Sequence, residues 1–481
     1  MKKKILAIII LAFISNVTAT DLRLRSMGGV RLAVPDREVQ INLYHLAQNQ
    51  AWLKANDSTN WSRYTFLNEN ESGPLHRFWD SRGLNYYSVS ISGQKHIDES
   101  KIFYGDIRYN VDIRKKMNRS LDKYPYDLDP FVLTDTTAGE FQYLGPQLSV
   151  AFNHQIFSDF YYGVSLDYAV NRGLKDIYTE AEVISRYIGA SLDFVYRLSP
   201  KINLGLTNSV YHLLDITKLT LQSDGQTPQT FRYRGLFEFR KSTGTSDRNS
   251  TYWGYQFCPQ ISLNSGHIET VFYLNYRYRW HEIYDGTSTR RYEGSYQEQS
   301  YGLRFVGRYN LSRDRSTAIT ADYQYNYIDN WAKEAVAGLL IHKGDYTNQY
   351  MLIGAFHKFN SLPLLATLEA SYDYSQPKEE DYLAKQAIDG SITRLDVRMG
   401  VELEAWKNRF LRGGYNYINY KENEVWEYYG DFQGNILTGG IGIRFSSIDL
   451  DVYGRYGHTN RKIDDASRWY YDFIIQLKHQ F

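Results

Sequence analysis

The segment 467–481 is the sequence feature that most limits how this chain can fold. Alternate positions from Trp469 to Phe481 carry aromatic or aliphatic side chains, with His479 as the exception, and the positions between them are mostly polar. Side chains of a β-strand point alternately to opposite faces, so one face of this strand is apolar. A strand of a soluble sandwich shows the same alternation, but a flat apolar strand at a sheet edge promotes aggregation. In a closed transmembrane barrel, the last strand instead pairs with the first and its apolar face meets lipid.

Composition favours a membrane barrel over a helical membrane protein. Aromatic residues make up 16% of the chain, with 44 Tyr and 9 Trp, and in barrels these residues collect at the two membrane interfaces. The mean hydropathy is negative, and no long apolar run follows residue 14, so membrane-spanning helices are not predicted. The 55 basic and 54 acidic residues give a net charge of +1, without the basic stripe expected of a nucleic-acid-binding protein.

The amino terminus reads as a secretory signal peptide over residues 1–19. Lys2, Lys3 and Lys4 precede an apolar run that ends at Ile14, and the small residue Ala19 offers a cleavage position. The run is shorter than the roughly 18 apolar residues of a membrane anchor. The chain has one cysteine, Cys258, which excludes an internal disulfide framework, so strand pairing has to provide stability.

Period-two segments recur along residues 61–481 and predict an all-β chain. The clearest are 101–114, 160–171, 186–197, 201–213, 267–281, 316–328, 347–359, 364–375, 391–405, 409–421, 435–446 and 448–458. Short turns alternate with longer polar stretches, predicted as outer loops at 115–139, 172–181, 282–296, 329–346, 376–390, 421–434 and 459–466. Short turns at one end and longer loops at the other are typical of a transmembrane antiparallel up-and-down β-barrel, and we expect roughly 16 to 18 strands.

One part of this pattern allows two interpretations. The run FRYRGLFEF, residues 231–239, fits either a wall strand or a hairpin that stands on an outer loop.

Charged residues of both signs occupy the face opposite the apolar one and are predicted to line the lumen. We single out Arg277, Arg279, Asp396, Arg398, Glu402 and Glu404. One interpretation is a charged path for a polar solute; the alternative is a set of cross-strand ion pairs that fill the barrel, because opposite charges on neighbouring strands pair readily. A strongly selective pore usually shows one sign of charge in its constricting ring.

The terminal strand resembles that of bacterial outer-membrane proteins, whose final aromatic residue is read by the barrel-assembly machinery. The resemblance gives Phe481 the role of an assembly signal, although His479 stands where such signals usually carry an apolar residue. It implies the outer membrane of a Gram-negative bacterium as the location, with outer-membrane lipid and the assembly machinery as partners.

Residues 26–53 resemble the opening of the FadL-like transporters of hydrophobic compounds, and similar openings occur in uncharacterised Bacteroidetes-type barrels. The matching positions are Gly28, Gly29, Asp36, Asn49 and Ala51, whereas Gln50 replaces the family's proline. The resemblance implies that residues 20–60 form a hatch that plugs the barrel. The alternatives are a periplasmic arm and a purely structural stopper.

Pro146 and Pro259 stand inside period-two segments, where each removes a donor from the strand ladder. In the FadL-like family a kink in an early strand opens the wall sideways and releases a hydrophobic substrate into the membrane. The resemblance makes Gly145 and Pro146 the candidate kink; the alternative is an ordinary β-bulge.

We therefore predict an outer-membrane barrel for passive uptake of a small amphipathic or hydrophobic compound. The alternative is a structural, assembly or secretion platform with no transport role. No catalytic, metal or cofactor site is predicted, because the eleven His residues are scattered without metal-ligand spacing and no nucleophile motif is recognisable.

Overall fold

The computed structural model describes residues 30, 41–56, 59–123, 128–176, 180–220, 227–312, 314–359, 361–426 and 429–481. The predicted signal peptide and three predicted hatch residues, Gly28, Gly29 and Asp36, lie outside this part of the chain. No helix within it is long and apolar enough to cross a membrane.

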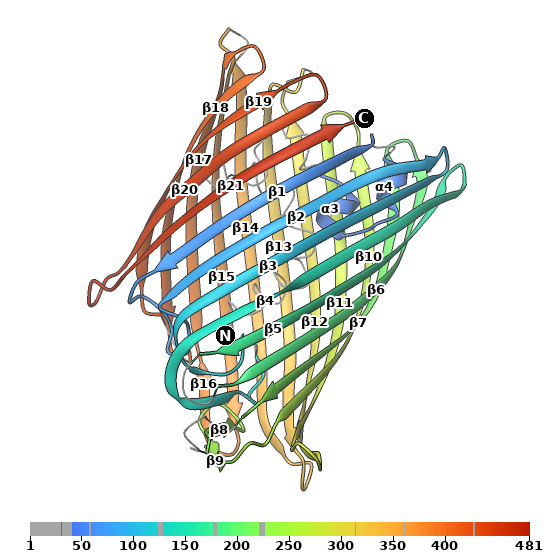
Figure 1. Ribbon diagram of the computed structural model, residues 1–481. Helices are drawn as coiled ribbons and strands as arrows, with labels where there is room; N and C mark the ends of the chain where they lie inside the picture. The colour runs from blue at the N-terminus through green and yellow to red at the C-terminus, as the bar shows by residue number, and fades with distance from the viewer. Residues whose placement is uncertain are drawn as a thin grey trace.

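Long β-strands dominate the described residues (Figure 1). Two short helices precede them, α3 (Leu43–Ala47) and α4 (Trp52–Ala55). The strands are β1 (Trp61–Ser72), β2 (Gly83–Asp98), β3 (Lys101–Ser120), β4 (Leu133–Phe157), β5 (Phe160–Lys175), β6 (Glu182–Ser199), β7 (Ile202–Lys218), β8 (Gln229–Tyr233), β9 (Phe239–Thr243), β10 (Arg248–Asn264), β11 (Ile268–Asp285), β12 (Arg291–Asn310), β13 (Thr317–Glu334), β14 (Leu340–Phe359), β15 (Leu364–Asp381), β16 (Gln386–Asp389), β17 (Ser391–Trp406), β18 (Arg409–Asn423), β19 (Phe432–Arg444), β20 (Ile448–Arg461) and β21 (Ser467–Gln480).

Eighteen of these strands form a closed antiparallel barrel, in which each wall strand pairs with the next wall strand along the chain. The strands β8, β9 and β16 are short additions to the loops. The wall closes where β1 pairs with β21, from Trp61 opposite Gln480 to Ser72 opposite Trp469. This confirms the predicted fold class and strand number. Closure leaves no strand edge in the lipid, which has no water to satisfy free backbone groups.

The strands are longer than the apolar alternation predicts. Three predicted loops, 282–296, 329–346 and 376–390, are wrong in this respect, since β11 runs to Asp285 and β12 resumes at Arg291. The predicted loops 329–346 and 376–390 are likewise mostly strand. The physical reason is that strand ends beyond the lipid meet water or loops on both faces, so they lose the apolar alternation while the backbone ladder continues.

The ambiguous run near residue 231 is a hairpin rather than a wall strand. β8 and β9 pair with each other from Gln229 opposite Thr243 to Tyr233 opposite Phe239. β8 also pairs with the first residues of β4, where Leu133 lies opposite Arg232. The hairpin thus belongs to the long connection between β7 and β10.

Pro146 interrupts one ladder without changing its register. Between Leu144 and Gln147 the pairing of β4 with β5 skips two residues, and the pairs on either side keep the same register. Pro259 has the same effect on the ladder between β10 and β11. The bulge expected as one alternative at Gly145 and Pro146 is therefore absent, and a sideways opening there stays a prediction.

Gly145 has a specific steric role at this point. A Cβ atom on Gly145 would lie 1.7 Å from the carbonyl oxygen of Val170 on β5. Only glycine allows the two backbones to approach this closely beside the proline.

Candidate functional site

The helices α3 and α4 lie inside the barrel, toward the end where the carboxyl terminus lies (Figure 1). They contact β3, β4, β5, β6, β10 and β11. Asn42 caps α3 by accepting a hydrogen bond from the backbone N–H of His45 at 2.9 Å, and Gln48 ends it in the left-handed conformation, with φ of 57°. These caps turn the chain sharply, so that both short helices face the wall. We call residues 41–56 the inner segment.

The inner segment buries an apolar face against an apolar part of the inner wall. Leu43, Leu46 and Ala51 pack in one cluster with wall side chains from several strands. The wall members are Tyr161, Val195, Cys258, Val271, Tyr273, Val306 and Leu352. Water-excluding contact of this kind stabilises docking by roughly 25 cal/mol per Å² of apolar surface buried.

Asn49 provides the polar part of the docking. Its Nδ2 donates to the backbone carbonyl of Phe194 on β6 at 2.9 Å and to Oε1 of Gln260 on β10 at 3.0 Å. Gln260 returns a bond from Nε2 to the carbonyl of Ala47 at 3.0 Å. Asn49 and Gln260 are both buried, so these bonds fix the orientation of the inner segment.

Two wall glycines make room for the inner segment. A Cβ atom on Gly163 of β5 would lie 2.6 Å from the backbone nitrogen of Ala51. A Cβ atom on Gly205 of β7 would lie 2.9 Å from Leu43 and 3.1 Å from Nδ2 of Asn49. Asn49 and Ala51 were predicted from the sequence, whereas Gln260 and both glycines were not, because single glycines and glutamines in strands carry no motif.

The predicted lumen residues lie on the inner face, mostly as ion pairs. Arg279 pairs with Glu298 at 2.9 Å, Arg398 with Asp396 at 2.6 Å and Glu402 with Arg412 at 2.7 Å. All six of these side chains are buried. This geometry fits the interpretation that mixed charges fill the wall.

Two predicted lumen residues differ from that group. Arg277 is buried on the same face of β11. Glu404 is only partly buried, and it accepts a hydrogen bond from the backbone N–H of Asn408 at 2.8 Å. Glu404 therefore stabilises the turn between β17 and β18 rather than facing the middle of the lumen.

The opposite end of the barrel is covered by packed loops. A second apolar cluster, here called the mouth cluster, joins loop residues to inward-facing strand ends. Its buried members are Leu128, Phe131, Leu236, Ile283, Tyr296, Ile328, Ala332, Ile341 and Tyr346. Both ends of the lumen thus carry a buried apolar cluster.

The β8–β9 hairpin crosses this mouth. On one side β8 pairs with β4. On the other side Asp381, the last residue of β15, accepts hydrogen bonds from the backbone N–H groups of Leu236 and Phe237 at 2.7 and 3.1 Å. Arg234 in the hairpin turn also pairs with Glu293 of β12 at 2.7 Å. The hairpin is therefore held from several strands at once.

The loops between β1 and β2 and between β18 and β19 complete the cover. Trp79 is almost fully buried and packs edge-on against Trp426, with ring centroids 5.0 Å apart. Asp80 pairs with Arg77 at 3.1 Å and accepts a hydrogen bond from the Tyr429 hydroxyl at 3.1 Å. Burial alone would raise the pKa of the Asp80 carboxyl, but Arg77, with help from Arg468 and the Tyr429 hydroxyl, more than offsets this and holds the pKa below its usual range.

Comparison with known proteins gives a family. The model of a family of unknown function (DUF6850) matches residues 50–416. No curated protein matches the sequence.

Solved structures also align with the chain, at low similarity. The copper transporter OprC has a TM-score of 0.49 and 8% identity, covering 85% of this chain and 63% of that one. The Pseudomonas putida toluene transporter TodX has a TM-score of 0.34 and 12% identity, covering 95% and 97%. The CymD monoaromatic hydrocarbon channel has a TM-score of 0.34 and 13% identity, covering 97% and 98%.

Proposed function

This chain belongs to the family of unknown function DUF6850, and we propose that it is a bacterial outer-membrane barrel for passive uptake of a small amphipathic or hydrophobic compound. The observation that carries the proposal is the inner segment, docked inside the barrel by Asn49 and Gln260 and accommodated by Gly163 and Gly205. A wall of this strand number encloses a lumen wide enough for a channel unless something fills it. The inner segment then acts as the hatch.

The resemblance of residues 26–53 to FadL-like transporters supports the hydrophobic substrate class. It also supports removal of residues 1–19, insertion in outer-membrane lipid and recognition of Phe481 by the barrel-assembly machinery as parts of the same proposal. In this proposal the substrate passes only when both the hatch and the cover at the opposite mouth have moved. The apolar wall cluster that the hatch now covers is the surface that an apolar substrate would meet.

Because both ends are covered, the test needs both to be opened. One variant lacks residues 21–55 behind an intact signal peptide, a second has the hairpin 229–243 replaced by a short Gly-Ser linker, and a third combines both changes. We expect single-channel conductance in planar bilayers near zero for the intact chain and each single variant, and porin-like for the combination. A combined variant that folds but stays closed would contradict uptake through the lumen.

The packed mouth favours a second candidate, a platform barrel that presents its loops to a partner. The observations behind it are the mouth cluster and the hairpin held across it. The same measurements separate the two candidates, since a platform predicts no conductance in the combined variant.

A further inference from the structure

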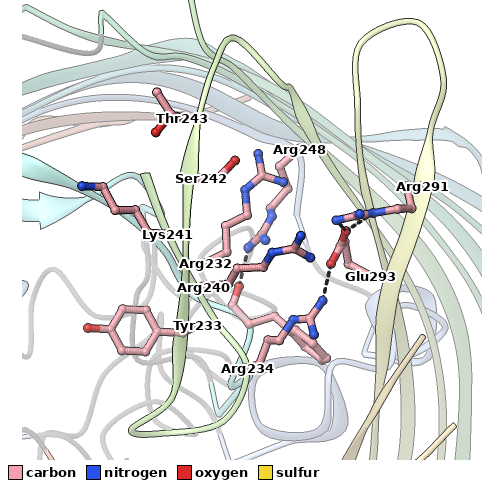
Figure 2. A pocket seen from close by; sticks show the side chains of 11 residues that line it. Arg232, Tyr233, Arg234, Arg240, Lys241, Ser242, Thr243, Arg248, Arg291 and Glu293 are labelled. Atoms are coloured by element: carbon pink, nitrogen blue, oxygen red, sulfur yellow. Dashed lines mark hydrogen bonds and ion pairs between the residues drawn. The ribbon is translucent and has the colours of Figure 1, made fainter. Parts of the chain in front are cut away.

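A basic cavity of about 230 Å³ lies beside the β8–β9 hairpin, at the end of the barrel opposite the hatch. Its lining includes five arginines and one carboxylate, namely Arg232, Arg234, Arg240, Arg248, Arg291 and Glu293. Figure 2 shows these arginines converging from the hairpin, from the start of β10 and from the start of β12. The cavity is separate from the inner segment and from the docking contacts described above.

Carboxylates neutralise this group only in part. Glu293 accepts hydrogen bonds from Arg234 at 2.7 Å and from Arg291 at 2.6 Å, and Arg234 also lies 3.9 Å from Glu334. Two further arginines, Arg232 and Arg248, share the single carboxylate of Asp285. In the described part of the chain no carboxylate pairs with Arg240, whose side chain is exposed.

The deeper part of the cavity concentrates positive charge. Arg232 and Arg248 both pair with Asp285, the latter at 3.0 Å from Nε. Arg232 is buried, and its Nε has no hydrogen-bond partner among the described residues. Burial and the neighbouring Arg248 lower the pKa of the Arg232 guanidinium below its ordinary value, and Asp285 offsets this only in part.

The hairpin register places two of these charges directly opposite each other. Arg232 on β8 is the cross-strand partner of Arg240 on β9. Like charges in this position destabilise a β-ladder. Lys241 follows Arg240 in the strand and also lines the cavity, although Figure 2 shows its side chain pointing away from the arginines. An anion in the cavity would relieve the repulsion between Arg232 and Arg240 and provide an acceptor for Nε of Arg232.

We propose that this cavity binds a phosphate group. Guanidinium groups present paired N–H donors that match phosphate oxygens two at a time. A phosphate monoester carries close to two negative charges at neutral pH, which suits several arginines with few carboxylates between them. The group has two possible sources, a soluble phosphorylated compound and the phosphorylated headgroup of a lipid in the surrounding leaflet. The proposal goes beyond the uptake function and does not depend on it.

The test uses the full chain in detergent micelles with glycerol 3-phosphate as the probe and calorimetry as the measurement. Arg240→Gln removes a cavity charge from an exposed position, so it leaves the buried core intact. Lys462→Gln is the control, because it removes one positive charge from an exposed loop position that does not line the cavity. We expect Arg240→Gln to weaken binding by about tenfold, equivalent to about 1.4 kcal/mol, and Lys462→Gln to change it less than about twofold.

Two comparisons identify the source of the phosphate. Nanodiscs with phosphorylated or dephosphorylated lipid A show whether a lipid headgroup occupies the cavity, in which case only the phosphorylated lipid competes with glycerol 3-phosphate. A soluble source predicts equal binding in both lipids. The proposal fails if wild type binds neither glycerol 3-phosphate nor phosphorylated lipid A, or if both variants weaken binding equally. Binding is measured with the hatch in place and without conductance, so the uptake proposal can fail independently.

Discussion

The carboxylate of Asp381 accepts a hydrogen bond from the backbone N–H of Leu236 at 2.7 Å, although the two residues are 145 positions apart in sequence. Asp381 ends β15, and Leu236 lies in the turn of the β8–β9 hairpin. The same number of wall strands separates β15 from β4 in either direction around the ring. Since β8 pairs with β4, this bond ties the hairpin to the far side of the barrel mouth.

Asp381→Ala should release the hairpin turn. The N–H groups of Leu236 and Phe237 would lose a charged acceptor in a buried place, which costs about 1 to 3 kcal/mol. We expect amide exchange of the peptide covering residues 234–238 to accelerate by roughly tenfold or more, measured by hydrogen–deuterium exchange. Asp389→Ala is the control, because Asp389 is exposed and its contacts, with Lys378 at 3.7 Å and with Nε2 of Gln376 at 3.1 Å, do not involve the hairpin. Equal acceleration in both variants would refute the role of Asp381.

Gly163→Val should displace the inner segment. The new side chain would collide with the backbone of Ala51, and a backbone contact cannot be relieved by a change of rotamer. Lys54, which is buried in the docked segment, should then become a site of tryptic cleavage. Gly439→Val is the matched control, since a Cβ atom there meets nothing within 4 Å. Unchanged cleavage at Lys54 in a folded Gly163→Val variant would show that the segment is held elsewhere.

Val401→Arg should destabilise the barrel by about 2 to 4 kcal/mol if the site lies near the bilayer midplane. Val401 is exposed on the outer face of β17, so a guanidinium there has to enter lipid. The measurement is reversible unfolding from lipid vesicles, with Val401→Leu as the control that keeps the site apolar. Glu402 next to it is no neutral control, because it accepts a hydrogen bond from Arg412 at 2.7 Å. Equal stabilities of the two Val401 variants would mean that this face does not meet lipid.

Docking of the β1–β2 loop should be lost in acid. The folded pKa of Asp80 lies below its usual value, so the unfolded state binds the proton more tightly. The stabilisation is therefore complete above the unfolded pKa of about 3.9 and disappears as the pH falls through the folded pKa. The readout is the fluorescence difference between the chain and its Trp79→Phe variant from pH 7 downward. Asp80→Asn should abolish the acid transition; a transition that persists in Asp80→Asn would assign it to another group.

The sequence alone determined the barrel and its closure, and it limited the number of strands to roughly 16 to 18. Alternation is a local property, and each wall strand that crosses lipid needs an apolar outer face, so Leu274 and Phe473 could be placed on that face without a structure. The lengths of the strands could not be read in this way. Beyond the lipid, pairing continues through residues such as Asp285 and Arg291, where water or packed loops replace lipid beside the strand and the alternation is lost.

The tertiary structure alone decided what fills the barrel at each end. Asn49 was selected by resemblance, but its partner Gln260 and the space left by Gly163 depend on which strands the closed ring brings to the same level. The run around Arg232 fitted a wall strand and a hairpin equally well, because both have the same period. The hairpin is stabilised by the hydrogen bond to Asp381 and by the pairing of β8 with β4. Both contacts form only when distant strands face each other across the mouth.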